Sequence, residues 1–148
     1  MISQTTKALL NSRKLLEATW NKNEEEVAKY IEEAHLETSI LQYNDENELS
    51  YMVSLAYYCT RDEYKIIREC PSGKGYANMI FISQRDKPAM IVELKRDEDV
   101  EKAINQIKER RYETIIKEQK KILYVAIVYN SKTKKHTCKI EEKINKCF

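Results

Sequence analysis

The chain has 148 residues, of which 42% are hydrophobic and 34% charged, and its net charge is +2. We expect one domain with a buried core, and the presence of only two glycines and two prolines argues against long disordered segments. No apolar run approaches the roughly 18 residues of a membrane span, and no signal peptide is recognisable, so we expect a cytoplasmic protein without a membrane partner. The four cysteines lack the spacing of a zinc site, which indicates reduced thiols.

The first third of the chain has helical periodicity. Apolar residues predict a helix over residues 7–18. Asn23 and Glu26 form a capping-box-like pattern that opens a second helix over residues 24–34. A third helix is predicted over residues 45–57, where acidic residues again precede an apolar stripe.

From residue 64 the pattern becomes that of β-strands. Five strands are predicted, over residues 64–69, 76–83, 89–95, 122–129 and 136–140. Gly73 and Gly75 predict a hairpin turn between the first two strands, because glycine allows the positive φ angles of tight turns. Asp99 caps a long helix that reaches Ile115, between the third and fourth strands. A helix crossing between strands favours an α/β fold with a central mixed sheet flanked by helices.

Charge is unevenly distributed along the chain. Residues 1–63 contain 6 basic and 12 acidic side chains, whereas residues 64–148 contain 20 basic and 12 acidic ones. The basic second part suits a polyanionic partner. A solvated, lysine-rich surface explains the charge equally well.

The third predicted strand ends in Glu93-Leu94-Lys95, and the two charged side chains point to one face because strand side chains alternate. The preceding residues 89–92 are apolar, so we expect both charges to emerge where a buried strand meets solvent. Asn78 on the neighbouring strand can lie beside Glu93. A carboxylate suits Mg²⁺, which can neutralise a phosphate and generate hydroxide from water. As an isolated pattern, Glu-x-Lys also describes a surface ion pair.

With Gln106 on the following helix, these residues resemble the PD-(D/E)XK nuclease superfamily and its restriction-endonuclease-like fold. Residues 43–47, 73–77, 88–95, 103–107 and 135–141 resemble one branch, the nuclease-like domain usually C-terminal in bacterial AAA-ATPase-like proteins. The resemblance implies a single domain over residues 1–148, with a helical extension over 1–40 and a nuclease-like core over 41–148.

Carried over residue by residue, the resemblance implies that Glu93 is a catalytic residue and metal ligand, Lys95 the catalytic lysine and Gln106 a supporting helix residue. Glu46 is implied as a further metal-binding acid, and Glu69 as an acid near the same sheet edge. A favourable interaction with the helix dipole explains Glu46 equally well. Alternatively, Gln106 is an ordinary polar residue that borders the apolar face of the helix.

The aspartate of the family pattern falls on Asn78, which is therefore a third candidate metal ligand. Asparagine keeps a carbonyl oxygen but lacks the negative charge, so we expect weak binding of Mg²⁺ or Mn²⁺ and slow hydrolysis. Asn78 is either a natural loss or a substitution introduced to disarm a nuclease.

DNA is the expected partner. Candidate nucleic-acid contacts are Lys74, Arg110, Arg111 and Tyr112, of which the tyrosine is suited to base stacking. The resemblance also implies a homodimer. No P-loop motif occurs in the chain, so the ATPase that the resemblance implies would be a separate partner.

Other residues receive structural interpretations. His35 and His136 are isolated in the sequence, which favours structural or solvent-facing roles over catalysis. Lys132, Lys134 and Lys135 lie at a predicted turn, where solvation is the more common role.

Two main functions follow from these observations. The first is a metal-dependent nuclease domain that hydrolyses DNA, weakened or inactivated by Asn78. The second is a catalytically degenerate nuclease fold that serves as a nucleic-acid-binding or protein-interaction module. A regulatory partner that docks through its acidic helical part is a third option.

Overall fold

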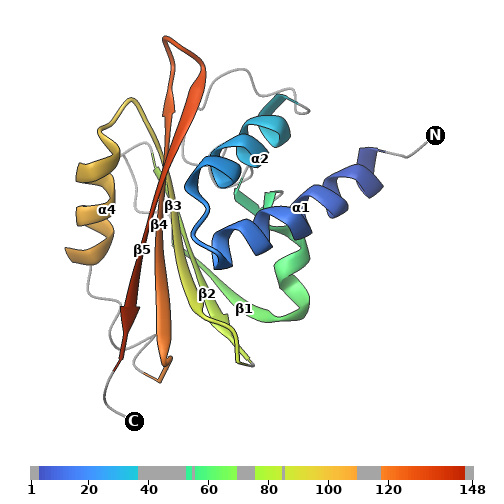
Figure 1. Cartoon of the computed structure of the whole chain (residues 1–148), viewed down its shortest axis with the longest axis vertical. Helices are drawn as coiled ribbons and strands as arrows, with labels where there is room; N and C mark the ends of the chain where they lie inside the picture. The colour runs from blue at the N-terminus through green and yellow to red at the C-terminus, as the bar shows by residue number, and fades with distance from the viewer. Residues whose placement is uncertain are drawn as a thin grey trace.

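A computed structural model of the chain describes residues 4–36, 53–54, 56–69, 76–84, 86–109 and 118–145. Its elements, in chain order, are α1 (Gln4–Trp20), α2 (Glu24–Leu36), η1 (Tyr58–Asp62), β1 (Tyr64–Glu69), β2 (Tyr76–Ser83), β3 (Ala89–Arg96), α4 (Val100–Glu109), β4 (Lys121–Asn130) and β5 (Lys135–Ile144). One sheet separates α4 on one side from α1 and α2 on the other (Figure 1). In the described part of the chain, no helix combines the length and apolar character that crossing a membrane requires.

The five strands lie in the sheet in the same order as in the chain. β3 and β4 are parallel, and the other three neighbouring pairs are antiparallel. A parallel pair needs a crossover connection, and here the connection contains α4. The predicted α/β fold, a central mixed sheet flanked by helices, is therefore confirmed.

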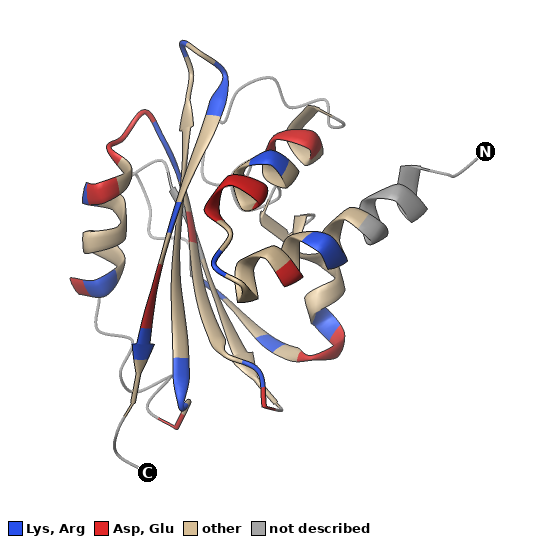
Figure 2. Ribbon diagram, in the orientation of Figure 1, with Lys and Arg blue, Asp and Glu red and all other residues tan. Residues whose placement is uncertain are grey.

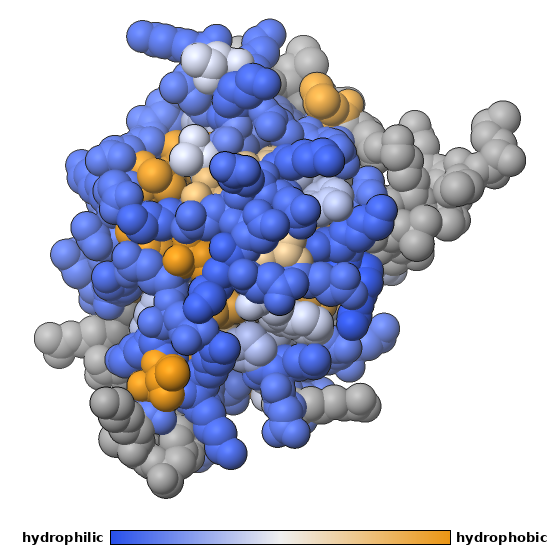
Figure 3. Space-filling model, viewed as in Figure 1, coloured by the Kyte–Doolittle hydropathy of each residue, from blue (hydrophilic) through white to orange (hydrophobic). Residues whose placement is uncertain are grey.

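Each face of the sheet has its own apolar core, because side chains along a strand alternate between the faces. The core under α1 and α2 includes Leu15, Leu16, Val27, Ile31, Met79, Phe81, Met90, Val92, Leu94, Leu123, Val125, Ile127 and Tyr129. The core under α4 includes Ile80, Ala89, Ile91, Ala103, Ile104, Ile107, Ile122, Tyr124, Ala126 and Val128. In contrast to these interiors, the face seen in Figure 3 is largely hydrophilic.

The turn between α1 and α2 follows from local hydrogen bonding. The backbone N–H of Asn23 donates to the carbonyl of Ala18 at 2.9 Å, and Lys22 has a left-handed φ of 56°. These two features are typical of a helix C-terminus that satisfies its last carbonyls. The side chain of Asn23 then accepts from the N–H of Glu26 at 3.3 Å, as the capping pattern predicts.

Several element boundaries differ from the predictions. β5 runs over Lys135–Ile144 rather than 136–140 because it pairs with β4 along its whole length. Of the helix predicted over 45–57, the described residues 53, 54 and 56 are helical, and the 3-10 helix η1 that follows was not predicted. The helix after Asp99 is described as far as Glu109, and its predicted extension to Ile115 lies outside the described residues.

Of the two roles predicted for His35 and His136, the structure supports the structural one, and the solvent-facing one is wrong. Both are buried, and their ring centroids lie 5.6 Å apart. Each also contacts the ring of Tyr129, at 5.2 Å and 5.0 Å respectively. Burial, together with the neighbouring His35, lowers the pKa of His136 to about 3. The two histidines therefore belong to the packing of α2 on the sheet.

Candidate active site

Glu93 and Lys95 lie on the α4 face of β3, directly after Ala89 and Ile91 of the apolar core on that face. The prediction that both charges emerge into solvent is wrong. Glu93 is 1% exposed and Lys95 is 5% exposed, and only Arg96 ends the buried run. The strand thus changes from apolar to charged on one face without leaving the interior.

The side chain of Lys95 is held by the helix that covers this face. Its Nζ donates a hydrogen bond to Oε1 of Gln106 in α4. Gln106 lies between Ala103 and Ile107 on a helix whose buried side packs against the sheet. The structure therefore brings together two of the predicted site residues, although eleven positions separate them in the sequence.

The register of the strands places three predicted residues in one row across the sheet. Asn78 lies directly opposite Glu93, and Glu69 lies directly opposite Asn78. Directly opposed residues of antiparallel strands belong to the same face, with Cβ atoms about 5 Å apart. The backbone thus confirms that Asn78 lies beside Glu93 and brings Glu69 into the same row.

A small residue completes this row on the other side of Glu93. Ala126 of β4 is the register partner of Glu93, and it is fully buried. Its methyl group occupies less space than any of the neighbouring apolar side chains of β4, so it crowds the Glu93 carboxylate least. Sequence reasoning missed this residue, because an alanine inside an apolar run gives no sign of which residue it will face.

Asp97, which sequence reasoning also missed, fixes the end of β3. Its Oδ1 accepts a hydrogen bond from the N–H of Ser131 at 2.7 Å, and its Oδ2 accepts one from the Ser131 hydroxyl at 2.6 Å. Its own N–H donates to the carbonyl of Tyr129 at 2.8 Å. The hydrogen bonds from Ser131 lower the pKa of Asp97. Because Asp97 has a φ of 54°, a conformation in which Asn and Asp are enriched, its residue type suits the position.

Two ion pairs connect α4 to β5 beside this site. Glu101 of α4 accepts from Lys139 at 2.6 Å, and Lys108 of α4 donates to Glu141 at 2.6 Å. Figure 2 shows acidic and basic residues along both α4 and β5. Each pair is partly exposed and contributes modestly to stability, and the apolar side of α4 packs on the sheet through Ala103, Ile104 and Ile107.

Glu93 is the acidic residue of this row whose side chain the structure describes. Mg²⁺ takes hard oxygen ligands, often one or two carboxylates with several waters retained. Glu93 supplies a carboxylate, and the residue opposite it, Asn78, is of a type that can supply an amide oxygen. Within the described residues, no group of three or more His, Cys, Asp or Glu could hold a metal ion. Glu46, the further predicted acid, lies outside the described residues.

The predicted nucleic-acid contacts are not described by the structure. Lys74, Arg110, Arg111 and Tyr112 all lie outside the described residues. A pocket of about 440 Å³ lies on the opposite side of the sheet from α4, and its described lining is Ser54, Tyr57, Tyr58, Arg61, Ile66, Arg68, Met79 and Phe81. None of the predicted site residues lines that pocket among those described.

Comparison with known proteins gives one family match. A family model described as the PD-(D/E)XK nuclease superfamily matches residues 46–139. The matched range begins before β1 and ends within β5, so it contains the whole row from Glu69 to Lys139 and also Gln106. No curated protein matches the chain.

Proposed function

The chain belongs to the PD-(D/E)XK nuclease superfamily, and we propose that it is a metal-dependent nuclease domain that hydrolyses DNA phosphodiester bonds. The observation that supports this most strongly is the burial of Glu93 and Lys95 together on one face of β3. Burying charged side chains costs free energy that apolar residues would not cost. Two such residues at the end of an otherwise apolar strand favour a catalytic role.

We assign the metal site to Glu93 and Asn78, with Glu46 as a further candidate acid. Mg²⁺ or Mn²⁺ bound there would neutralise charge on the scissile phosphate and lower the pKa of a bound water. The carboxylate of Glu93 supplies the negative charge that holds the ion. Ala126 beside it leaves this part of the row less crowded than a larger side chain would.

We assign to Lys95 the roles of contacting the scissile phosphate and orienting the attacking water. Lys95 lies two residues from Glu93 on the same face, so the two side chains are neighbours at the proposed site. The hydrogen bond to Gln106 fixes where the ammonium lies, which makes Gln106 a positioning residue. Because this face is shielded from water, the charge of Lys95 interacts more strongly with a phosphate than an exposed lysine would.

Asn78 favours a second function. With an amide where the family pattern has a carboxylate, the row offers less negative charge to a metal ion. A nuclease fold with this substitution can act as a nucleic-acid-binding or protein-interaction module without cutting. A homodimer and an ATPase partner follow from the family resemblance alone and stay predictions.

Cleavage of supercoiled plasmid with Mg²⁺ or Mn²⁺ tests the proposal. We expect little cleavage by the chain itself, clear cleavage by Asn78→Asp, and none by Asn78→Asp combined with Glu93→Ala. Addition of EDTA should abolish cleavage by Asn78→Asp. If Asn78→Asp does not cut but the chain shifts DNA in a salt-sensitive manner, the binding module is the better description. If no form cuts or binds DNA at low salt, both functions are wrong.

A further inference from the structure

The turn between β4 and β5 has a fixed conformation. The side chain of Asn130 accepts hydrogen bonds from the N–H groups of Lys132 at 2.9 Å and Thr133 at 3.1 Å. The N–H of Lys134 donates to the carbonyl of Asn130 at 2.7 Å. Ser131 is tied to Asp97 at the end of β3 by two further bonds. The turn is therefore anchored both internally and to the strand that carries Glu93 and Lys95.

The residue type at position 134 is unusual for this conformation. Lys134 has a left-handed φ of 61°, a region that glycine or asparagine occupies at lower cost. A lysine there costs on the order of 1 kcal/mol. The chain thus carries a strained lysine at the point where a glycine would make the turn more stable. Lys22 has a similar φ of 56° in the turn after α1, so the conformation alone assigns no function to position 134.

Three lysines of this hairpin lack the ion pairs that other lysines of the chain make. Among the described residues, Lys132, Lys134 and Lys135 have no acidic partner within ion-pair distance, and all three are exposed. By contrast, the described ion pairs of the chain include Lys22, Lys102, Lys108, Lys121 and Lys139. The nearby carboxylate of Asp97 accepts hydrogen bonds from Ser131 and lies 3.7 Å from Arg96, and it also interacts electrostatically with Lys132. The hairpin therefore presents concentrated positive charge.

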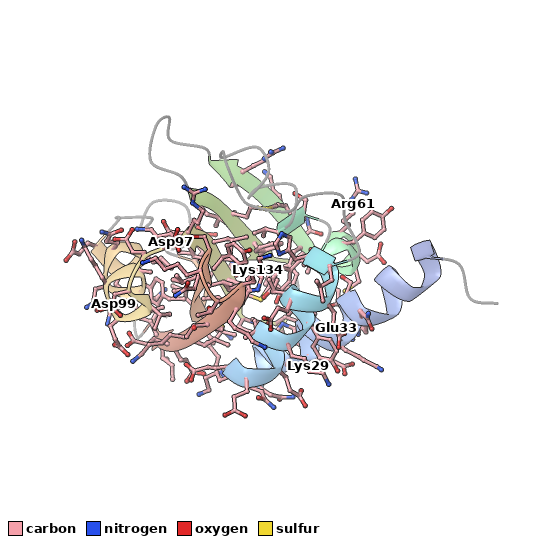
Figure 4. All side chains as sticks on the ribbon, turned by 90° about the horizontal axis from the view of Figure 1, so that it is seen from above. Lys29, Glu33, Arg61, Asp97, Asp99 and Lys134 are labelled. Carbon is pink, nitrogen blue, oxygen red and sulfur yellow. The ribbon has the colours of Figure 1, made fainter. Side chains whose placement is uncertain are left out.

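The hairpin lies at the end of the sheet where β3 ends. Val128 is the register partner of both Lys95 and Thr137, so Lys135 lies two residues beyond the Lys95 row on the same face. At about 3.3 Å per residue, the hairpin begins roughly 13 Å along the strands from the Glu93 row. In Figure 4, which looks down on this end, Lys134 lies between Asp97 and Asp99 on one side and α2 on the other.

We propose that the β4–β5 hairpin binds the phosphodiester backbone of a DNA duplex through Lys132, Lys134 and Lys135, at phosphates flanking the one at Lys95. This inference rests on the proposed function, from which it takes DNA as the ligand. Each strand of duplex DNA has a phosphate about every 3.4 Å along the axis, so the distance to the Glu93 row corresponds to on the order of four phosphates. The bonds from Asn130 and Asp97 fix the backbone of the turn from which the three lysine side chains extend.

The test compares two triple variants that remove the same charge. Lys132, Lys134 and Lys135 are changed to Gln in the hairpin variant. In the control variant Lys65, Lys120 and Lys143 are changed to Gln; they are also exposed and without ion pairs in the described structure, but lie at the opposite end of the sheet. Fluorescence anisotropy with a short mixed-sequence DNA duplex, without divalent metal, gives the dissociation constant at several salt concentrations.

Three phosphate contacts contribute about 2.7 to the slope of log affinity against log salt. We expect the slope of the hairpin variant to be shallower by this amount, and the slope of the control variant to be nearly unchanged. An unchanged slope in the hairpin variant, or an equal decrease in both, would overturn the inference. Asp97→Ala adds net positive charge but releases the hairpin, and it should nevertheless weaken binding several-fold. Tighter binding by Asp97→Ala would contradict the role of the tether.

The failure of this inference can be distinguished from failure of the proposed function. If Asn78→Asp cleaves plasmid equally well with and without the three hairpin substitutions, the proposed nuclease function is supported and the hairpin inference is wrong. If neither cleavage nor binding occurs in any form, both are wrong. Circular dichroism of each variant shows whether it is folded, and the control variant reports the effect of charge loss alone.

Discussion

The two faces of β3 are similarly buried but chemically different. On the face under α1 and α2, the strand contributes Met90, Val92 and Leu94 to an uninterrupted apolar core. On the face under α4, it ends in Glu93 and Lys95, which are also almost inaccessible to solvent. The side chains on the two faces of β3 therefore do not differ in solvent exposure. The first face contributes hydrophobic stability, whereas the second has charged side chains where apolar ones would be less costly.

Removing the charges of the α4 face should have the largest effect, and it should affect activity rather than stability. In an Asn78→Asp background, Lys95→Met should lower the cleavage rate about 10²- to 10⁴-fold, because an ammonium aimed at the phosphate is lost. The double change Glu93→Leu and Lys95→Met should abolish cleavage while leaving the free energy of unfolding equal or higher. Plasmid cleavage and urea unfolding measure the two quantities. A strongly destabilised double variant would show that these charges are structural.

The matched change on the other face should have the opposite effect. Leu94→Ala removes a fully buried side chain between Glu93 and Lys95 in sequence but on the α1–α2 face. We expect a loss of about 2–5 kcal/mol in the free energy of unfolding, measured with urea. In an Asn78→Asp background the folded fraction should retain its cleavage activity. If activity is lost at temperatures where the variant is fully folded, the two faces are not functionally separate.

The histidine cluster makes the α1–α2 face sensitive to acid. The pKa of His136 is about 3 in the folded chain and about 6.5 when unfolded, so the unfolded state binds the proton first as the pH falls. Stability should be fully present above pH 6.5 and decrease between 6.5 and about 3, by at most about 1.4 kcal/mol per pH unit from this residue. Urea unfolding at neutral and mildly acidic pH measures this loss. His136→Phe should reduce the pH dependence, and an unchanged dependence would exclude His136 as its source.

The smallest effect is expected from the ion pairs that border the site. Lys139→Gln breaks the pair with Glu101, and because Glu101 is largely exposed the free energy of unfolding should decrease only slightly. Urea unfolding at low and high salt measures it, and salt should weaken the parent more than the variant. A loss as large as that of Leu94→Ala would mean that α4 depends on this contact for its position.

The contrast between the faces was partly visible in the sequence. The alternation rule placed Glu93 and Lys95 on one face, and the order of the predicted strands placed Asn78 on the strand beside Glu93. Their burial was not visible, because it depends on α4 covering the strand end. Gln106 was identified from the family resemblance, and its contact with Lys95 required the helix to be placed in space.

Features that depend on distant contacts were missed altogether. His35 and His136 are about a hundred positions apart, so nothing local indicates that their rings meet. Ala126 acquires its significance only from the parallel register of β3 and β4. Aspartate is common in turns, so Asp97 does not stand out in the sequence. Its bonds to Ser131 depend on the hairpin lying beside the end of β3.

Binding of Mn²⁺ tests most directly whether the charged face of β3 is a metal site. Calorimetric titration of the chain, Asn78→Asp and Glu93→Ala separates metal binding from cleavage. We predict weak binding by the chain, at least tenfold tighter binding by Asn78→Asp because a second negative charge is added, and no measurable binding by Glu93→Ala. Equal affinity in all three forms would contradict the assignment of Glu93 and Asn78 as metal ligands.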